Sequence, residues 1–300
     1  MNLQRIYENL KKEYESRGVE IDEEKLRQMA WIKRDRMLFE NTSAVSSSAA
    51  AAGAAGAGGG GGSGNRRSVT PPPPSQGFIF RVNTSLGNGN ATFVIPTSGS
   101  YTYDYIATWT LVSDPSVTGS ESGLTGTSTI TFPSGGQYDI EITGLFPAME
   151  FGKFSTDPAK VIGIMQWGSN TWQSMSRMFY GCSNLSLYLA TDQPDLSEVT
   201  IMSSTFQNTT SFNGDISGWD VSGVTNMILM FAGAASFNAD LSGWDVSNVT
   251  NMDVMFDGAT SFNRDLSGWC VSGIFPQPSG FDFGATSWIL PRPDWGSPCS

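Results

Sequence analysis

The side chains that could do chemistry in this chain are its carboxylates, because the 300-residue sequence contains no histidine. Without histidine, the commonest general base, the usual partner of a nucleophilic serine or cysteine, and the most frequent transition-metal ligand are missing. The most regular carboxylates are Asp215, Asp240 and Asp265, which follow one another at intervals of 25 residues. They could form a weak calcium or glycan site, or each could hydrogen-bond its own turn backbone. Strict repetition favours the turn, and no carboxylate stands out as a catalyst, so we expect no enzyme and no cofactor.

Two aromatic positions share the interval of the aspartates. They are occupied by Trp219, Trp244 and Trp269, and by Phe206, Phe231 and Phe256. The tryptophans could offer a platform on which sugars stack, or they could fill the interior of each repeat. We expect the interior, with both sets stacked as a structural ladder on their equivalents one repeat away.

Positions at which the repeats differ are better candidates for partner binding, because stacking does not fix their side chains. The residues that vary most in charge and size are Gln207, Asp253, Asp257 and Arg264. We expect a partner-binding face to be made of them.

The repeat itself is the element that must position all these side chains. The segments Val199-Thr-Ile-Met, Val224-Thr-Asn-Met and Val249-Thr-Asn-Met are separated by 25 residues, and a degenerate copy begins at Trp172. Repeats of this length are typical of one coil of a solenoid, in which successive coils rise by about 4.8 Å. The sequence therefore predicts a solenoid of about four 25-residue coils over residues 151–270.

The full pattern, Val-Thr-Asn-Met-x-x-Met-Phe-x-Gly-Ala-x-Ser-Phe-Asn-x-Asp-Leu-Ser-Gly-Trp-Asp, is read from Val224 to Asp245. It resembles the BspA-type leucine-rich-repeat surface proteins, whose repeats are also seen in mycoplasma lipoproteins and in marine bacteria and phages. The resemblance covers about residues 160 to 300 of the chain. It implies a leucine-rich-repeat-like solenoid, surface display and adhesion, and it implies no catalysis.

Residues 76–150 alternate apolar and polar side chains, as in Phe78-Ile-Phe-Arg-Val82 and Tyr138-Asp-Ile-Glu-Ile142. Short runs of this kind, separated by Gly, Asn, Pro and Ser, predict a small antiparallel β-sandwich. The segment resembles the PKD-like, immunoglobulin-like module that often precedes such repeats. It departs from that module at Thr108-Trp-Thr-Leu, where a Trp-Gly-Asp-Gly sequence is usual.

The first 40 residues carry an apolar stripe with helical spacing, which predicts an α-helical anchor or oligomerisation segment. The stripe consists of Leu3, Ile6, Tyr7, Leu10 and Tyr14. Residues 41–75 are rich in Ser, Ala and Gly and end in Pro71 to Pro74. Such a segment cannot bury enough side chain to offset its ordering entropy, so we expect a flexible linker.

Three cysteines are present. Cys182 lies in the first coil, where we expect a small buried apolar side chain. Cys270 and Cys299 bracket a C-terminal cap over residues 271–300, so a disulfide between them is plausible and would form outside the cytoplasm. The predicted fold class is therefore multidomain: helical segment, linker, β-sandwich, solenoid and cap.

The acidic balance, with 28 Asp and Glu against 17 Lys and Arg, argues against nucleic acid as a partner. The N-terminal segment has no apolar run long enough for a signal sequence or a membrane span. A surface-type composition without an export signal is expected for a phage structural protein, since virions assemble in the cytoplasm and leave by lysis. We therefore expect a virion accessory protein such as a fibre, decoration or tail adhesin.

In this interpretation residues 1–40 dock on other virion proteins or on copies of themselves, and the sandwich or solenoid contacts a host surface protein or glycan. The alternative is a bacterial cell-surface adhesin that is exported by a non-standard route or lacks its leader.

Overall fold

The structure is a computed structural model that describes residues 7–9, 11–12, 30, 77–152 and 157–299. The chain divides into two compact units, Met1–Thr70 and Pro71–Ser300. In the first unit the described residues are helical, and Tyr7 is half-buried. The other anchor residues, Leu3, Ile6, Leu10 and Tyr14, and the expected linker lie outside the described residues.

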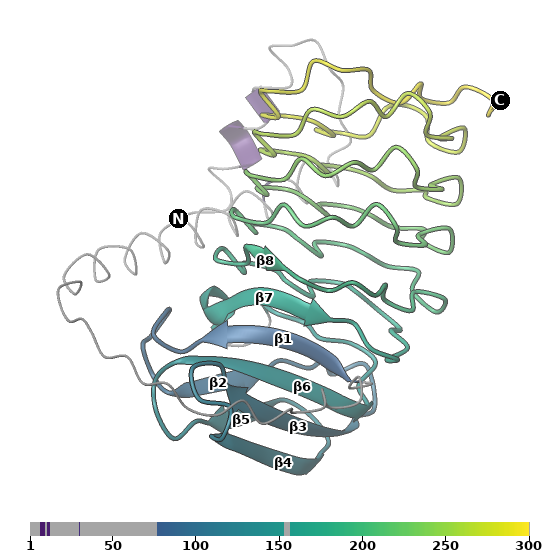
Figure 1. Ribbon diagram of the computed structural model, residues 1–300. Coiled ribbons are helices and arrows are strands. Elements are labelled where there is room, and N and C mark those ends of the chain that lie inside the picture. The colour runs from purple at the N-terminus through teal and green to yellow at the C-terminus, as the bar shows by residue number, and fades with distance from the viewer. Residues whose placement is uncertain (1–6, 10, 13–29, 31–76, 153–156, 300) are drawn as a thin grey trace. The chain divides into compact units, whose positions relative to one another are not determined.

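The second unit begins with a strand region whose elements are labelled in Figure 1. The elements are β1 (Phe78–Asn83), β2 (Thr92–Ile95), β3 (Asp104–Leu111), β4 (Thr118–Leu124), β5 (Ser128–Thr131), β6 (Gln137–Leu145), the 3-10 turn η2 (Pro158–Lys160), β7 (Val161–Gln166) and β8 (Leu187–Tyr188). Six strands form one sheet in the order β4-β3-β6-β1-β7-β8, and β2 pairs with β5 in a separate two-stranded sheet. Among the strands of the described residues, β7 and β8 alone pair in parallel, and isolated parallel bridges such as Ile201–Asn226 follow in the repeats.

Alternation of side chains explains why these segments form strands. In β1, Phe78, Phe80 and Val82 are fully buried, and the residues between them are only partly covered. Successive side chains of a strand point to opposite faces, so one face of the sheet becomes apolar. On the other face, Arg81 of β1 pairs with Asp139 of β6 at 2.6 Å, directly across the two strands.

A buried lysine fixes the connection between β1 and β2. The ammonium of Lys160 donates hydrogen bonds to Asn88 Oδ1 at 2.6 Å and to the carbonyl oxygens of Asn90 and Thr92 at 2.9 Å each. Its Nζ also lies 3.0 Å from a carboxylate oxygen of Asp157. A buried charge is tolerated when it is paired and hydrogen-bonded in this way.

The sheet continues into the repeats. Strand β7 lies antiparallel to β1 on one side and parallel to β8 on the other. Directly after β7, Trp167 packs between the strand region and the repeats: its ring centroid lies 5.3 Å from that of Phe78 and 5.3 Å from that of Trp219. One continuous hydrophobic core therefore runs from the strand region into the repeats.

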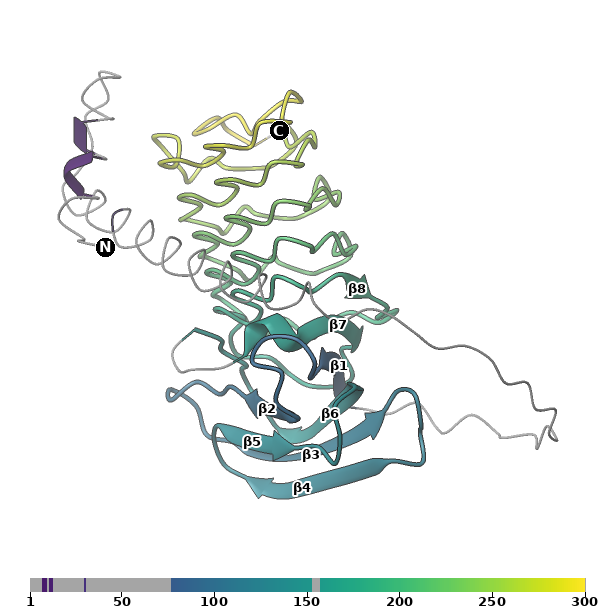
Figure 2. The same cartoon turned by 90° about the vertical axis from the view of Figure 1, so that its left-hand side faces the viewer.

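After Tyr188 the described residues form turns and isolated bridges, with neither a helix nor a strand. The chain winds in successive layers, visible as the green and yellow turns in Figures 1 and 2. Backbone hydrogen bonds join each layer to the next: Phe206 N donates to Met230 O, and Phe231 N to Met255 O, at 2.9 Å each. We call residues 199–274 the repeat stack.

Inside the repeat stack the phenylalanines form two columns. Ring centroids of Phe206 and Phe231 are 5.8 Å apart, and those of Phe231 and Phe256 are 5.4 Å apart. A parallel column consists of Phe212, Phe237 and Phe262, with steps of 5.9 Å each. The rings lie nearly parallel, so each layer covers the apolar face of the one before it.

The predicted fold class is wrong. The strands do not form a self-contained antiparallel sandwich, because β7 and β8 extend the larger sheet beyond it. The repeats contain no strand per coil, so a leucine-rich-repeat-like solenoid is not what the structure shows. An N-terminal α-helical segment is not shown either, since only six residues of 1–40 are described.

The physical reason lies in the backbone of the repeats. Ser204, Leu229 and Val254 have φ values of 58°, 60° and 60°, in the left-handed region. A left-handed residue turns the chain and ends any extended run. Each repeat is therefore made of consecutive turns.

Candidate functional site

The three repeated aspartates predicted as weak calcium candidates each cap a turn. Asp215 Oδ1 accepts hydrogen bonds from the backbone N of Ser217 at 3.0 Å and from its hydroxyl at 2.7 Å. Asp240 accepts from Ser242 N at 3.0 Å, and Asp265 from both groups of Ser267. Within the described part of the chain, no three metal-ligating side chains cluster together.

These hydrogen bonds also set the charge of the carboxylates. The hydroxyl and then the backbone N–H of Ser217 lower the pKa of Asp215 below its ordinary value. Ser267 lowers the pKa of Asp265 in the same way, and Ser242 lowers that of Asp240, with the backbone N–H acting most strongly. A carboxylate that accepts hydrogen bonds is stabilised in its ionised form.

A second column of turn-capping aspartates was not singled out from the sequence. Asp195, Asp220 and Asp245 accept hydrogen bonds from Ser197, Ser222 and Ser247. The signal was available, since Asp-x-Ser begins at residues 195, 220 and 245, again at intervals of 25 residues.

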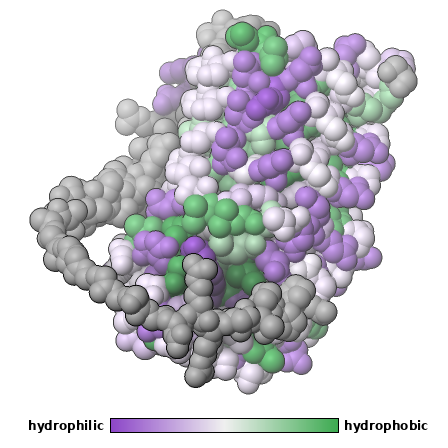
Figure 3. All heavy atoms as spheres, in the orientation of Figure 1, coloured by the Kyte–Doolittle hydropathy of each residue, from purple (hydrophilic) through white to green (hydrophobic). Residues whose placement is uncertain are grey.

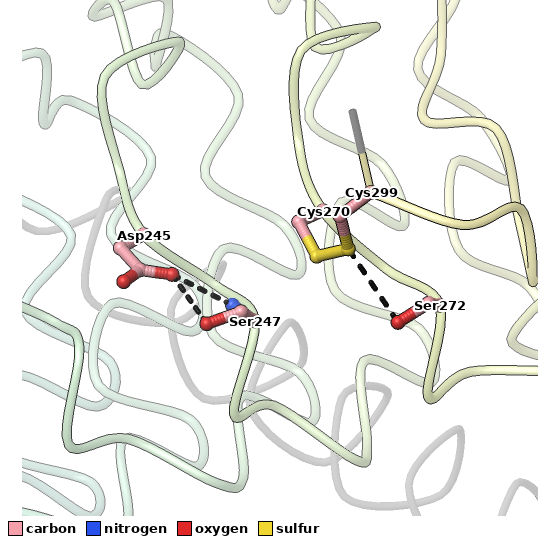
Figure 4. The surroundings of a disulfide bond; sticks show 5 residues. All are labelled: Asp245, Ser247, Cys270, Ser272 and Cys299. Carbon is pink, nitrogen blue, oxygen red and sulfur yellow. Dashed lines mark hydrogen bonds between the residues drawn. A yellow bond between two sulfur atoms is a disulfide. The ribbon is translucent and has the colours of Figure 1, made fainter.

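The last repeat replaces this second cap. Cys270 stands where Asp220 and Asp245 stand in the earlier repeats, and it forms a disulfide with Cys299. Figure 4 shows the disulfide beside the Asp245–Ser247 turn of the neighbouring layer. The sulfur of Cys299 lies 3.5 Å from the hydroxyl of Ser272, the residue equivalent to Ser247. Cys182 is fully buried, and burial raises the pKa of its thiol.

The aromatic positions face the interior. Trp219, Trp244 and Trp269 are 3 to 4% exposed, and Phe206, Phe231 and Phe256 are fully buried. The indole N–H of Trp244 donates to Ile216 O at 3.1 Å, and that of Trp269 donates to Leu241 O at 2.8 Å. These rings therefore present no face on which a sugar could stack.

The four partner-binding candidates occupy unlike surroundings. Gln207 is 4% exposed, which places its side chain out of a partner's reach. Asp253 and Arg264 are half-buried and join neighbouring layers: Asp253 Oδ1 accepts from Ser279 N at 2.6 Å, and Arg264 Nε donates to Asn238 O at 2.7 Å. Asp257 is also half-buried. The side chains of Asp253 and Arg264 thus tie neighbouring layers together.

A polar cavity lies at the head of the repeat stack. It has a volume of about 600 Å³. Its walls come from β8 with the loop that follows it, and from the first full repeat: Ser186, Tyr188, Ala190, Thr191, Gln193, Asn213, Gly214, Asp215, Ser217 and Gly218. A volume between about 300 and 1,000 Å³ is usual for small-molecule sites. We call this feature the head cavity.

Tyr188 is held firmly at the edge of the head cavity. Its hydroxyl accepts hydrogen bonds from the indole N–H groups of Trp167 at 3.1 Å and Trp219 at 3.4 Å. A Cβ added to Gly214 would lie 2.7 Å from Cγ of Tyr188, so only glycine allows this approach. Burial is the main cause that raises the pKa of the Tyr188 phenol.

Several polar groups of the head cavity have no partner among the described residues. Both hydrogen bonds of Asp215 go to Oδ1, which leaves Oδ2 unused. The side chains of Gln193 and Thr191 make no hydrogen bond, and Nδ2 of Asn213 makes none while its Oδ1 accepts from Asn238 N at 2.8 Å. The cavity thus offers both donors and acceptors, and the side chains of Gln193 and Thr191 among them are exposed.

Asp215 of this site was singled out from the sequence as a weak calcium candidate, and Tyr188 and Gln193 were not. The signal that was missed lies in the layer before the first full repeat, where two residues differ from those at the equivalent positions of the later repeats. Counting back 25 residues, Tyr188 stands in the asparagine column of Asn213, and Gln193 stands where Gly218 recurs. The large side chains at these two places line the cavity.

Comparison with known proteins gives one family match. Residues 173–282, just over a third of the chain, match the family described as Mycoplasma protein of unknown function, DUF285. The match covers the repeats and agrees with a mycoplasma-type or BspA-type repeat surface protein. No curated protein and no solved structure matches the chain. Among the described residues, no helix is long and apolar enough to cross a membrane.

Proposed function

We propose that this chain is a non-enzymatic attachment protein of a phage virion, displayed on the particle as a fibre, decoration or tail adhesin. Residues 1–40 dock on other virion proteins, a PKD-like strand region follows the linker, and the repeats contact the host surface. The observation that carries the proposal is the head cavity, a set of unused hydrogen-bonding groups held on a layered scaffold.

The rigidity of the scaffold supports recognition. The layers are joined by backbone hydrogen bonds, by the asparagine column and by the stacked phenylalanines. Binding groups that are fixed before the ligand arrives lose little entropy on binding. Many copies on one particle would add avidity to weak single contacts.

The state of the carboxylates supports a non-catalytic role. A general acid or base needs a pKa near the working pH, which requires a raised pKa for Asp. Serine hydrogen bonds lower the pKa of Asp215, Asp240 and Asp265 instead.

Charge favours a partner other than nucleic acid. Residues 77–300 contain six basic and 19 acidic residues, a net charge of −13. The face of the repeats seen in Figure 3 is mostly hydrophilic. Such a surface repels a phosphate backbone and is compatible with a protein or a glycan on a cell surface.

A bacterial cell-surface adhesin is the second candidate, and the match to a Mycoplasma family favours it. Mass spectrometry of purified virions and of host envelope fractions separates the two. We expect peptides from residues 3–40 and from the repeats together in virions. Repeat peptides found only in the envelope fraction, without the N-terminal peptides, would show a processed cell-surface adhesin and would overturn the virion proposal.

A further inference from the structure

We infer that the head cavity binds a neutral sugar residue, such as a terminal hexose or N-acetylhexosamine of a surface glycan. The inference rests on the proposed attachment function and names the ligand class of that site. It is carried by the chemistry of the ten residues that line the cavity.

The charges around the head cavity disfavour an anionic ligand. The wall holds one ionised group, the carboxylate of Asp215, and no lysine or arginine. Asp192, which accepts hydrogen bonds from the backbone N of Trp167 and Gly168, adds a second negative charge close to Tyr188. An anionic ligand such as a phosphate or a sialic acid would meet repulsion without a compensating cation, so the ligand is not an anion.

The donors and acceptors of the cavity wall match a ligand that carries hydroxyl groups. Asp215 Oδ2 is an unused acceptor, Asn213 Nδ2 an unused donor, and the Gln193 amide supplies both. Adjacent hydroxyls of a sugar each donate and accept, so they match a carboxylate set beside two amides. An apolar ligand would leave these groups unpaired, which costs affinity.

The aromatic side chain of Tyr188 adds an apolar contact surface to the head cavity. Tyr188 is half-buried and is fixed from behind by Phe212, 6.2 Å away between ring centroids, and by two indole hydrogen bonds. Tyr188 also lines the cavity, so it brings an aromatic side chain next to the polar groups. The C–H face of a pyranose packs on such a ring while its hydroxyls reach the amides and the carboxylate.

The repeats provide a matched control. Asp215 and Asp240 cap the same kind of turn, with Ser217 and Ser242, but only Asp215 lines the cavity. The variants Asp215→Ala and Asp240→Ala therefore both lose the hydrogen bond from the backbone N of the serine two residues on. Gln193→Ala removes an exposed side chain that makes no hydrogen bond within the described protein, so it leaves the fold unchanged.

The test is saturation-transfer difference NMR of the full chain with the methyl glycosides of glucose, galactose, mannose and N-acetylglucosamine, and with methyl sialoside as the anionic comparison. We expect at least one neutral glycoside to bind with a Kd of about 1 mM or tighter, and the sialoside not to bind. Asp215→Ala and Gln193→Ala should each weaken binding about tenfold or more, and Asp240→Ala should not.

Two outcomes would overturn the inference. One is the absence of binding by every neutral glycoside, and the other is binding that Asp215→Ala and Gln193→Ala leave as strong as Asp240→Ala does. Attachment of the fluorescently labelled chain to host cells is measured in parallel. If the chain attaches while the sugar test fails, the ligand class is wrong and the attachment function stands; if it does not attach, the proposed function fails as well.

Discussion

Two positions in every repeat take left-handed backbone angles, and they shape the turns of the stack. The second of them is occupied by Asn208, Gly233 and Gly258, with φ values of 61°, 71° and 68°. Glycine reaches this region without strain, whereas a side chain with a Cβ does so at a cost of about 1 kcal/mol or more. The repeat therefore constrains single residues through backbone shape as well as through packing.

Gly233→Ala should lower the free energy of unfolding by about 2 kcal/mol, because the new Cβ takes a left-handed angle and meets Oδ1 of Asn208. Gly243→Ala is the control, since nothing lies within 4 Å of a Cβ there and its angle is ordinary. Urea unfolding measures both. Equal midpoints for the two variants would contradict the role given to the left-handed glycine.

The turn-capping aspartates make stability depend on pH. Because the folded state lowers the pKa of Asp240, Asp245 and Asp265, their contribution is complete above the pKa of an unfolded aspartate and is lost as pH falls through the lowered folded value. The urea midpoint should therefore fall as pH drops from about 5 to about 2. Replacing the three with asparagine, which keeps an oxygen acceptor, should make this fall shallower. Identical pH profiles would show that other groups cause the loss.

At the scale of elements, the last layer of the repeat stack differs from the middle layers because a cysteine replaces one turn-capping aspartate. Asp220 and Asp245 cap their turns with serine hydrogen bonds, and in the last repeat Cys270 takes this place and bonds Cys299. A capped turn holds only its own few residues. The disulfide closes a segment of 29 residues and so ties the C-terminal cap to the last layer.

The double variant Cys270→Ser, Cys299→Ser should lose about 3 kcal/mol of unfolding free energy, because the open chain regains the entropy of the closed segment. The variant Cys270→Asp, Cys299→Ser should recover about 1 kcal/mol of this, since an aspartate can accept from Ser272 as Asp245 does from Ser247. Both are compared with the oxidised protein by urea unfolding. If the double serine variant were as stable as the oxidised protein, the disulfide would not stabilise the C-terminal cap on the last layer.

The repeats were predictable from the sequence, and the shape of each repeat was not. The 25-residue spacing placed Phe231 correctly on its equivalent Phe256, because identical layers must stack like on like. Trp244 was expected to stack on its equivalents, but its ring packs against Phe231 and its indole N–H donates to Ile216 O of the layer before. Leucine and valine disfavour left-handed angles, so nothing about Leu229 and Val254 signalled the turns that they form. The head cavity was missed because it depends on side chains that break the repeat, such as Gln193.

At the scale of the whole molecule, the described part of the second unit shares one core. Phe78 of β1 stacks on Trp167, and Trp172 packs edge-on against both Phe78 and Phe146. Strand β1 also pairs with β7 along one edge. The strand region and the repeats therefore stabilise each other.

A fragment of residues 151–300 should fail to fold alone, because it exposes Trp167, Trp172 and the free edge of β7. A fragment of residues 77–300 keeps the sheet and should unfold in a single transition. Circular dichroism and calorimetry distinguish these results. A stable, monomeric 151–300 fragment would show that the repeats are independent of the sheet.

The layered contacts also determine how the length of this protein can change. A central unit such as residues 224–248 lies between the head cavity and the disulfide, and neighbouring units offer the same stacking surfaces on both sides. Loss or duplication of one such unit would shift the two ends by about one layer, about 4.8 Å, and leave each end intact. The length of the repeat stack is thus adjustable in whole steps by gain or loss of a single gene segment, while the head cavity at one end and the disulfide at the other are inherited unchanged.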